Sequence, residues 1–381
     1  MTSSSRRFAL DVFAAALAVV VAGCSRSDGT KEYAAAEAAY GLRDLRKAEK
    51  LAGECVRLAP ANVDALVMAA RIKIDLGEMA EARDFVEKAK SLAPGDADVR
   101  LLDAYVACYQ QEYARALETF GAIAGDPTMD AKIRSQALAG SGVVELLRNE
   151  TDLARIDFLK ALRLDRRNPA AWYHLGHLYH RAGYSEAALE QFDIYVRLEE
   201  TASRRVQDVQ RVTIPKLKDE IARQAADRPG ASDRNSAASA AALAEAEAAW
   251  KKGQYKTAKG KYLAAYASDP LSYPAALGVA KALEKTDATA DGQKKTFEYL
   301  KAACALRPSA ISTYLKTGEL AFKLGHYATA VEIYSRALAA DPANFMVVDG
   351  LIRSLRKTGS KDGARIATAY QAYRDLITKK R

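Results

Sequence analysis

Cysteine, histidine and tryptophan are scarce in this sequence, which has four cysteines, four histidines and two tryptophans in 381 residues. So few cysteines and histidines exclude a disulfide-dense scaffold and a zinc-ribbon framework. Ten prolines and 22 glycines exclude collagen-like and low-complexity chains, and a hydrophobic content of 49% excludes wholesale disorder. Alanine is abundant while valine, isoleucine and threonine are thinly spread, which favours helix over sheet. We expect an all-α protein.

Sequence motifs of catalysis and of phosphate binding are missing as well. The chain has no Gly-x-Ser-x-Gly nucleophile motif, no P-loop and no His-Glu-x-x-His zinc motif. We therefore interpret the protein as a non-enzyme that carries no cofactor.

Charge is divided unevenly between the two halves of the chain. Residues 1–200 hold 26 Lys and Arg against 30 Asp and Glu, a net of −4, whereas residues 201–381 hold 31 against 18, a net of +13. A basic half of this kind suits anionic lipid, nucleic acid or an acidic partner, but it is also typical of a solvated helix surface. Of these partners we favour a protein over nucleic acid.

The amino terminus combines two arginines with a short apolar run. Arg6 and Arg7 precede an apolar run of twelve residues, 12–23, which ends in Val-Ala-Gly followed by Cys24. This pattern resembles a bacterial lipoprotein signal peptide with its lipobox. The resemblance implies that residues 1–23 are removed and that Cys24 becomes the new amino terminus. It also implies that Cys24 is acylated with fatty acids such as palmitate.

A membrane-spanning helix is the main alternative for this segment. Twelve apolar residues rise only about 18 Å at 1.5 Å each, which is short of a hydrocarbon core of roughly 30 Å. Asp11 lies at the entrance of the run, so the apolar segment begins after it. Ser25, not Asp, follows the cysteine. By resemblance to enterobacterial lipoproteins, this implies an outer-membrane lipoprotein facing the periplasm.

The rest of the chain repeats with a period of 34 residues. Small and aromatic neighbours recur at fixed offsets around an alanine. Twelve residues later, four of the repeats have a proline that ends a helix, at Pro60, Pro94, Pro270 and Pro342. The alanines that mark the period are Ala48, Ala82 and Ala116, then Ala154 and Ala188, and finally Ala330 and Ala364.

This pattern resembles the tetratricopeptide repeat family, which has Trp, Leu-Gly and Tyr on a first helix and Ala, an aromatic residue, Ala and Pro on a second. The resemblance implies a right-handed α-solenoid of about nine helix-turn-helix repeats, in which small residues let helices approach and aromatics fill the spaces between them. The two strongest matches are Trp172, Leu175, Gly176, Tyr179, Gly183, Ala188 and Phe192, and Tyr314, Gly318, Gly325, Tyr327, Ala330, Tyr334, Ala337 and Pro342.

The register of the repeats divides the chain behind the signal peptide of residues 1–23. Residues 24–200 form an amino-terminal array of about five repeats, and residues 239–381 form a carboxy-terminal array of about four. Residues 201–238 lack the repeat signature and connect the two, as a helix over 201–224 with a kink at Pro215 and a loop over 228–236. Insertions lengthen the turn at 126–130 and the inter-helix loop at 286–292.

Three histidines lie on one predicted helix, at 174, 177 and 180. Two such imidazoles could share a metal ion, but the third lies too far along the axis and no cysteine or carboxylate completes a tetrahedral set. We expect no metal site. Cys55, Cys108 and Cys304 fall where the repeat has small packing residues, and we interpret them as buried thiols.

Inward-facing positions of the first helices are where members of the family bind extended peptides or a partner's helix. In the fifth repeat these positions give Ala170 together with the candidate residues Tyr173, His177, His180 and Arg181. In the last repeat they give Met346 and Asp349 together with the candidates Arg353, Arg356 and Lys357. The Lys and Asn set that clamps a peptide carboxylate in chaperone-binding members is absent.

These features predict a lipid-anchored periplasmic scaffold that binds other proteins or peptides through its groove. The complex that it assembles would be a secretion, pilus, polysaccharide-export or outer-membrane biogenesis apparatus. The alternative is a regulator of an envelope enzyme such as a peptidoglycan synthase or a protease.

Overall fold

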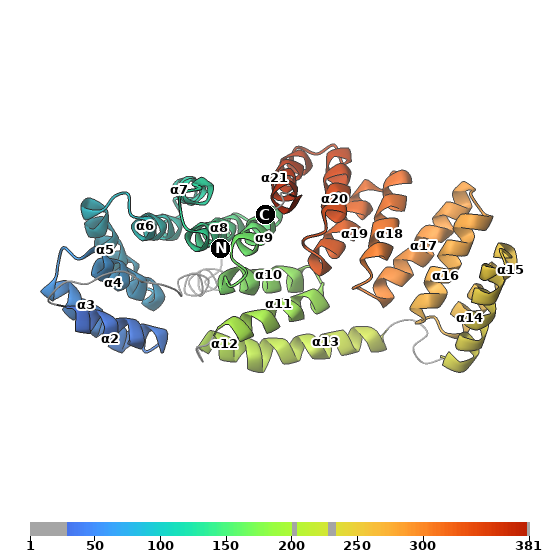
Figure 1. The fold of residues 1–381 in the computed structure, drawn as a ribbon, viewed down its shortest axis with the longest axis horizontal. Coiled ribbons are helices and arrows are strands. Elements are labelled where there is room, and N and C mark those ends of the chain that lie inside the picture. The colour runs from blue at the N-terminus through green and yellow to red at the C-terminus, as the bar shows by residue number, and fades with distance from the viewer. Residues whose placement is uncertain (1–28, 200–203, 228–233, 379–381) are drawn as a thin grey trace. The chain divides into compact units, whose positions relative to one another are not determined.

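The computed structural model describes residues 29–199, 204–227 and 234–378, and within these ranges every regular element is a helix. The predicted signal peptide and Cys24 lie outside the described residues. None of the described helices is both long and apolar enough to cross a bilayer. The fold is an α-solenoid, as the sequence predicted (Figure 1).

Nine antiparallel helix pairs make up the described chain, in the register that the 34-residue period predicted. Pairs α2 to α11 form what we call the first array, and pairs α14 to α21 the second array. The first array consists of α2 (Thr30–Gly41), α3 (Leu45–Leu58), α4 (Val63–Leu76), α5 (Met79–Leu92), α6 (Ala97–Tyr109), α7 (Tyr113–Gly125), α8 (Ala131–Leu147), α9 (Thr151–Leu164), α10 (Pro169–Arg181) and α11 (Ser185–Leu198). The second array consists of α14 (Ser236–Lys251), α15 (Tyr255–Ser268), α16 (Tyr273–Thr286), α17 (Ala290–Leu306), α18 (Ile311–Lys323), α19 (Tyr327–Ala340), α20 (Phe345–Lys357) and α21 (Lys361–Thr378).

The described chain divides into two compact units. Residues up to 182 together with 188–215 form one, and residues 183–187 together with those after 215 form the other. Between the arrays, the chain continues as α12 (Arg204–Asp208), a π-helical turn at Val209–Thr213 and α13 (Ile214–Ala226). The wide turn immediately precedes Pro215, which lacks the N–H that a regular α-helix would bond to the carbonyl four residues earlier.

Polar caps begin the first helix of most repeats. A side chain at the residue before the helix accepts a hydrogen bond from the backbone N–H three residues later, which satisfies one of the free donors of the first turn. Such bonds join Asn62 to Ala65 at 3.1 Å, Asp96 to Val99 at 3.0 Å, Asn168 to Ala171 at 3.2 Å and Asn344 to Val347 at 3.4 Å. The second helices α5, α7 and α19 begin without a side-chain cap.

Small residues set the spacing of the helices, as the repeat pattern predicted. Ala188 and Ala330 are completely buried. A methyl group on Gly176 would lie 2.8 Å from the ring of Phe192, and one on Gly318 would lie 2.6 Å from the ring of Tyr334. Each glycine thus gives room to the aromatic ring of the second helix of its own repeat.

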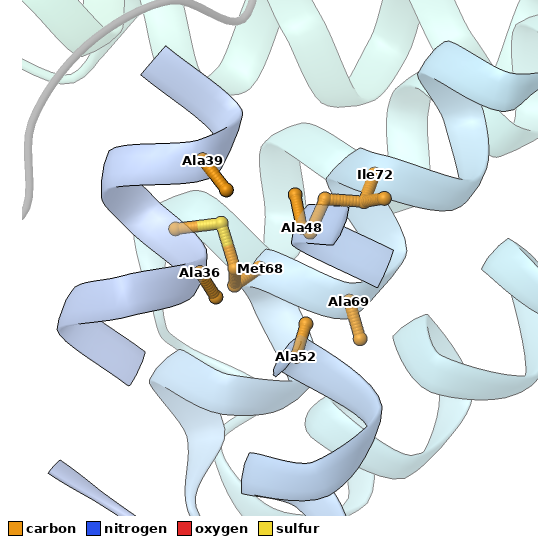
Figure 2. Close-up of a cluster of buried hydrophobic side chains, with 7 residues drawn as sticks. All are labelled: Ala36, Ala39, Ala48, Ala52, Met68, Ala69 and Ile72. Carbon is orange, nitrogen blue, oxygen red and sulfur yellow. The ribbon is translucent and has the colours of Figure 1, made fainter. Parts of the chain in front are cut away.

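The core of each array is rich in alanine. In the first two repeats, buried alanines of α2 and α3 meet two larger side chains of α4, Met68 and Ile72 (Figure 2). In the second array, Ala246, Ala258 and Ala282 form a similar cluster around Tyr262, with Val279 and Leu283 completing it. Short side chains bring the helices close together, and one or two longer ones fill the remaining space.

Candidate functional site

A pocket of about 550 Å³ opens in the last two repeats of the second array. Its apolar lining comes from Leu315, Ile352, Met346 and the ring of Tyr334. Ile352 is 2% exposed, whereas Met346 is 49% exposed, so the pocket has an apolar floor and an accessible apolar rim. Four of the five predicted inward-facing positions of α20 line it, namely Met346, Asp349, Arg353 and Arg356.

Three arginines and two carboxylates share this pocket. Arg353 pairs with Glu319 at 3.0 Å, and Arg374 pairs with Asp349 at 2.5 Å. Both carboxylates are therefore neutralised by arginines of the same pocket. Arg356 also lines the pocket and is exposed, but it forms no ion pair with any residue that the structure describes.

A second hollow, of about 330 Å³, adjoins the first along α18. Glu319 lines both, and the second is also lined by Lys316, Lys323, Glu284 and residues of α17. Lys323 lies 3.8 Å from Glu319, whereas Lys316 is exposed and has no ion pair among the described residues. The two hollows together follow α18 and α20, the first helices of successive repeats.

In the first array, Tyr173 and His177 come together in a packed aromatic cluster. Their ring centroids are 4.5 Å apart, and His177 also contacts the ring of Phe192 at 4.9 Å. The guanidinium of Arg205, from α12, lies 5.4 Å from the centre of the Tyr173 ring. Burial lowers the pKa of His177 to about 4, with a smaller effect from the positive charge of Arg181.

The open groove that we predicted at the fifth repeat is therefore largely filled. Ala170 is completely buried and Tyr173 is 8% exposed, so the prediction that they face an open groove is wrong. The period places Tyr173 on the inner side of its helix, but it does not reveal that α12 packs against this side. His180 is partly buried and Arg181 is exposed; neither joins the hollows of the second array. Lys357 is exposed beside the larger pocket but does not line it.

A buried polar cluster in the first two repeats has no counterpart in our sequence predictions. The side chain of Asp75 is fully buried and accepts hydrogen bonds from the Tyr40 hydroxyl at 2.8 Å and from Arg43 at 2.6 Å. A buried carboxylate needs such donors to offset its lost hydration. The donors come from the neighbouring repeat, at positions outside the family pattern, which is why the motif search did not find them.

The other titratable candidates are structural. Cys55, Cys108 and Cys304 are buried and unbridged, as predicted, and burial raises the pKa of Cys108 to about 12 and that of Cys304 to about 11. His174 is completely buried and stacks on Phe158 with centroids 5.1 Å apart. In the part of the chain that the structure describes, no three His, Cys, Asp or Glu side chains gather as a metal site would require.

Family profiles described as tetratricopeptide repeat match residues 39–106, 169–200 and 315–377. These segments fall in both arrays, and residues 169–200 correspond to the pair α10 and α11. The chain is a tetratricopeptide repeat protein. Proteins of this class bind other proteins or peptides and are generally scaffolds without enzymatic activity. A comparison with curated proteins finds no match.

Solved structures similar to this chain include other helical repeat proteins. The Cut9-Hcn1 hetero-tetramer of APC/C is 14% identical, covers 92% of this chain and 80% of that one, and has a TM-score of 0.35. The type IV pilus biogenesis factor PilW is 18% identical over 52% of this chain and 93% of its own, with a TM-score of 0.39. PilF of Pseudomonas aeruginosa is 16% identical over 59% and 95%, with a TM-score of 0.37. Similarity at this level carries no information about binding partners.

Proposed function

We propose that this protein is a lipid-anchored, non-enzymatic scaffold of the bacterial envelope. It is held through acylated Cys24 at the periplasmic face of the outer membrane, and it helps to assemble a secretion, pilus, polysaccharide-export or outer-membrane biogenesis complex. The observation that carries the proposal is a lipobox cysteine only six residues ahead of Thr30, where a chain composed of nine helical repeats begins.

Two features support a scaffold over an enzyme. The second array offers concave, chemically mixed surfaces suited to side chains of another protein. Burial raises the pKa of the Cys108 and Cys304 thiols, so little reactive thiolate forms at neutral pH, and burial keeps His177 neutral there. A regulator of an envelope enzyme would use the same surfaces, and the identity of the bound partner separates the two proposals.

The anchor is tested by growing cells with labelled palmitate. Wild-type protein should take up the label and sediment with membranes, whereas Cys24→Ala should take up none and remain unprocessed or leave the membrane. Ser25→Ala is the matched control, because it changes the neighbouring residue while it keeps the acylated cysteine. An unlabelled wild type, or equal labelling of Cys24→Ala, would contradict the lipoprotein proposal.

The scaffold role is tested by mild crosslinking in intact cells, followed by identification of the attached proteins. Subunits of one envelope complex should be recovered with wild type and lost with Cys24→Ala if the anchor brings the scaffold to its site. Recovery of a single envelope enzyme would favour the regulator. Recovery of cytoplasmic proteins alone would contradict both proposals.

A further inference from the structure

The side chains that line the larger pocket of the second array indicate which class of partner it can bind. We propose that it binds an acidic segment of another protein, in which a carboxylate lies next to an apolar side chain. This inference rests on the proposed role of the second array as a binding surface and states what that surface recognises.

The charge balance of the pocket favours an anionic guest. Its own carboxylates are already satisfied, because Glu319 pairs with Arg353 and Asp349 pairs with Arg374. Arg356 is the cation left over, exposed on the pocket wall without an ion pair to any described residue. A guanidinium in this state is a ready donor for a carboxylate, which it can hold through two parallel hydrogen bonds.

The apolar lining indicates which kind of side chain lies next to that carboxylate in the guest. Met346 is half exposed at the rim, and the neighbouring Phe345 is 49% exposed as well. Leu315 and Ile352 provide apolar surface deeper in the pocket. A guest with one aliphatic or aromatic side chain would cover this surface, and flexible methionines adapt well to such contacts.

Polar groups next to the pocket indicate an extended guest. Lys316 lines the adjoining hollow, is exposed and has no ion pair among the described residues. A segment that runs from Arg356 past Glu319 toward Lys316 would meet a second unpaired cation. A flat bilayer surface could contact the exposed cations but could not reach the buried Ile352 in the floor of the pocket, so we favour a peptide over anionic lipid.

The test selects ligands from a random library of linear peptides displayed on phage, with the whole chain purified in detergent and immobilised. Selected peptides should be enriched in Asp or Glu beside Leu, Met or Phe. Arg356→Glu should weaken their binding at least about tenfold, since it replaces attraction by repulsion, and added salt should weaken binding to wild type. Met346→Ser should weaken binding by a smaller factor.

Lys256→Glu on α15 is the matched control, because it makes the same charge change at an exposed residue that does not line the pocket. It should alter binding less than about twofold, and circular dichroism should show equal helicity in all variants. Peptides without acidic enrichment, no selected peptides, or binding unchanged by Arg356→Glu would overturn the inference. So would Arg356-dependent binding of phosphatidylglycerol vesicles that selected peptides do not displace. If crosslinking recovers envelope partners equally with wild type and Arg356→Glu, the scaffold role stands and the pocket assignment fails.

Discussion

Single residues in the turns show how closely the repeats keep one backbone conformation. Five residues before the marker alanine, eight of the nine repeats have a residue with positive φ. Five of these are glycines, such as Gly325 at φ 78°. The other three are Arg43, Gln111 and Asn149, which bear the steric cost of a left-handed conformation that glycine avoids.

Gln111→Gly should therefore stabilise the protein. Gln111 has φ 64° and is exposed, so its replacement relieves strain without removing packing, by about 0.5–1 kcal/mol. Thermal unfolding followed by circular dichroism measures the change. Gln110→Gly, one residue earlier at φ −73°, should destabilise instead. Equal effects of the two substitutions would show that the turn conformation is not the cause.

His177 gives the fold a dependence on pH. It stays neutral in the folded state with a pKa of about 4, whereas the unfolded side chain titrates near 6.5. Unfolding therefore takes up a proton at pH values between these two. The contribution of His177 to the free energy of unfolding is present in full above pH 6.5 and is lost as the pH falls toward 4. Between pH 7 and 5.5 the loss should be about 1 kcal/mol.

Urea unfolding at pH 7 and pH 5.5 measures this contribution. His177→Phe should reduce the difference between the two values, because it keeps a ring in the cluster and removes the titration. His326→Phe is the control, since His326 is exposed in a turn of the second array. A pH difference that stays the same in His177→Phe would contradict the assignment.

At the scale of the helix, the repeat pattern predicted the elements well because it reports packing directly. Alanine or glycine every 34 residues marks the places where two helices touch, so nine pairs could be placed from sequence. Exposure was harder to predict, as Ala170 and Tyr173 show. Tyr173 is covered in part by a residue in α12, Arg205, which lies in a segment without the repeat signature. The pairing of Asp75 with Arg43 was missed for the same reason, because the repeat consensus describes spacing and not charge.

Overpacking one helix contact tests this register. Ala330→Leu inserts a larger side chain at a completely buried position of α19 and should cost about 1–3 kcal/mol of unfolding free energy. Ala328→Leu, two residues earlier and exposed on the same helix, should change stability little. If thermal unfolding shows that Ala328→Leu lowers the melting temperature more than Ala330→Leu does, the helix faces are assigned wrongly.

For the whole molecule, the two units differ in what they offer to a partner. The first array buries Tyr173 and largely buries His177, whereas the second leaves two hollows open along α18 and α20. The two halves of the chain also differ in net charge, because the excess of Lys and Arg lies in the second half. From its charge, the sequence could therefore single out the second half as a candidate binding surface. It could not locate the pocket, because the pairing of Glu319 and Asp349 with particular arginines depends on side chains 25 to 34 residues apart.

The side-chain caps and left-handed turns of the repeats also bear on how the chain acquires its structure. Most helix pairs have their own start signal and their own reversal, and the nearest neighbours of a pair in space are its neighbours in sequence. Folding of such a chain needs few long loop closures, so it can begin at many places and spread from pair to pair. A polypeptide that emerges amino terminus first could complete its early repeats before the later ones arrive. Each finished pair would then present a template face to the next pair.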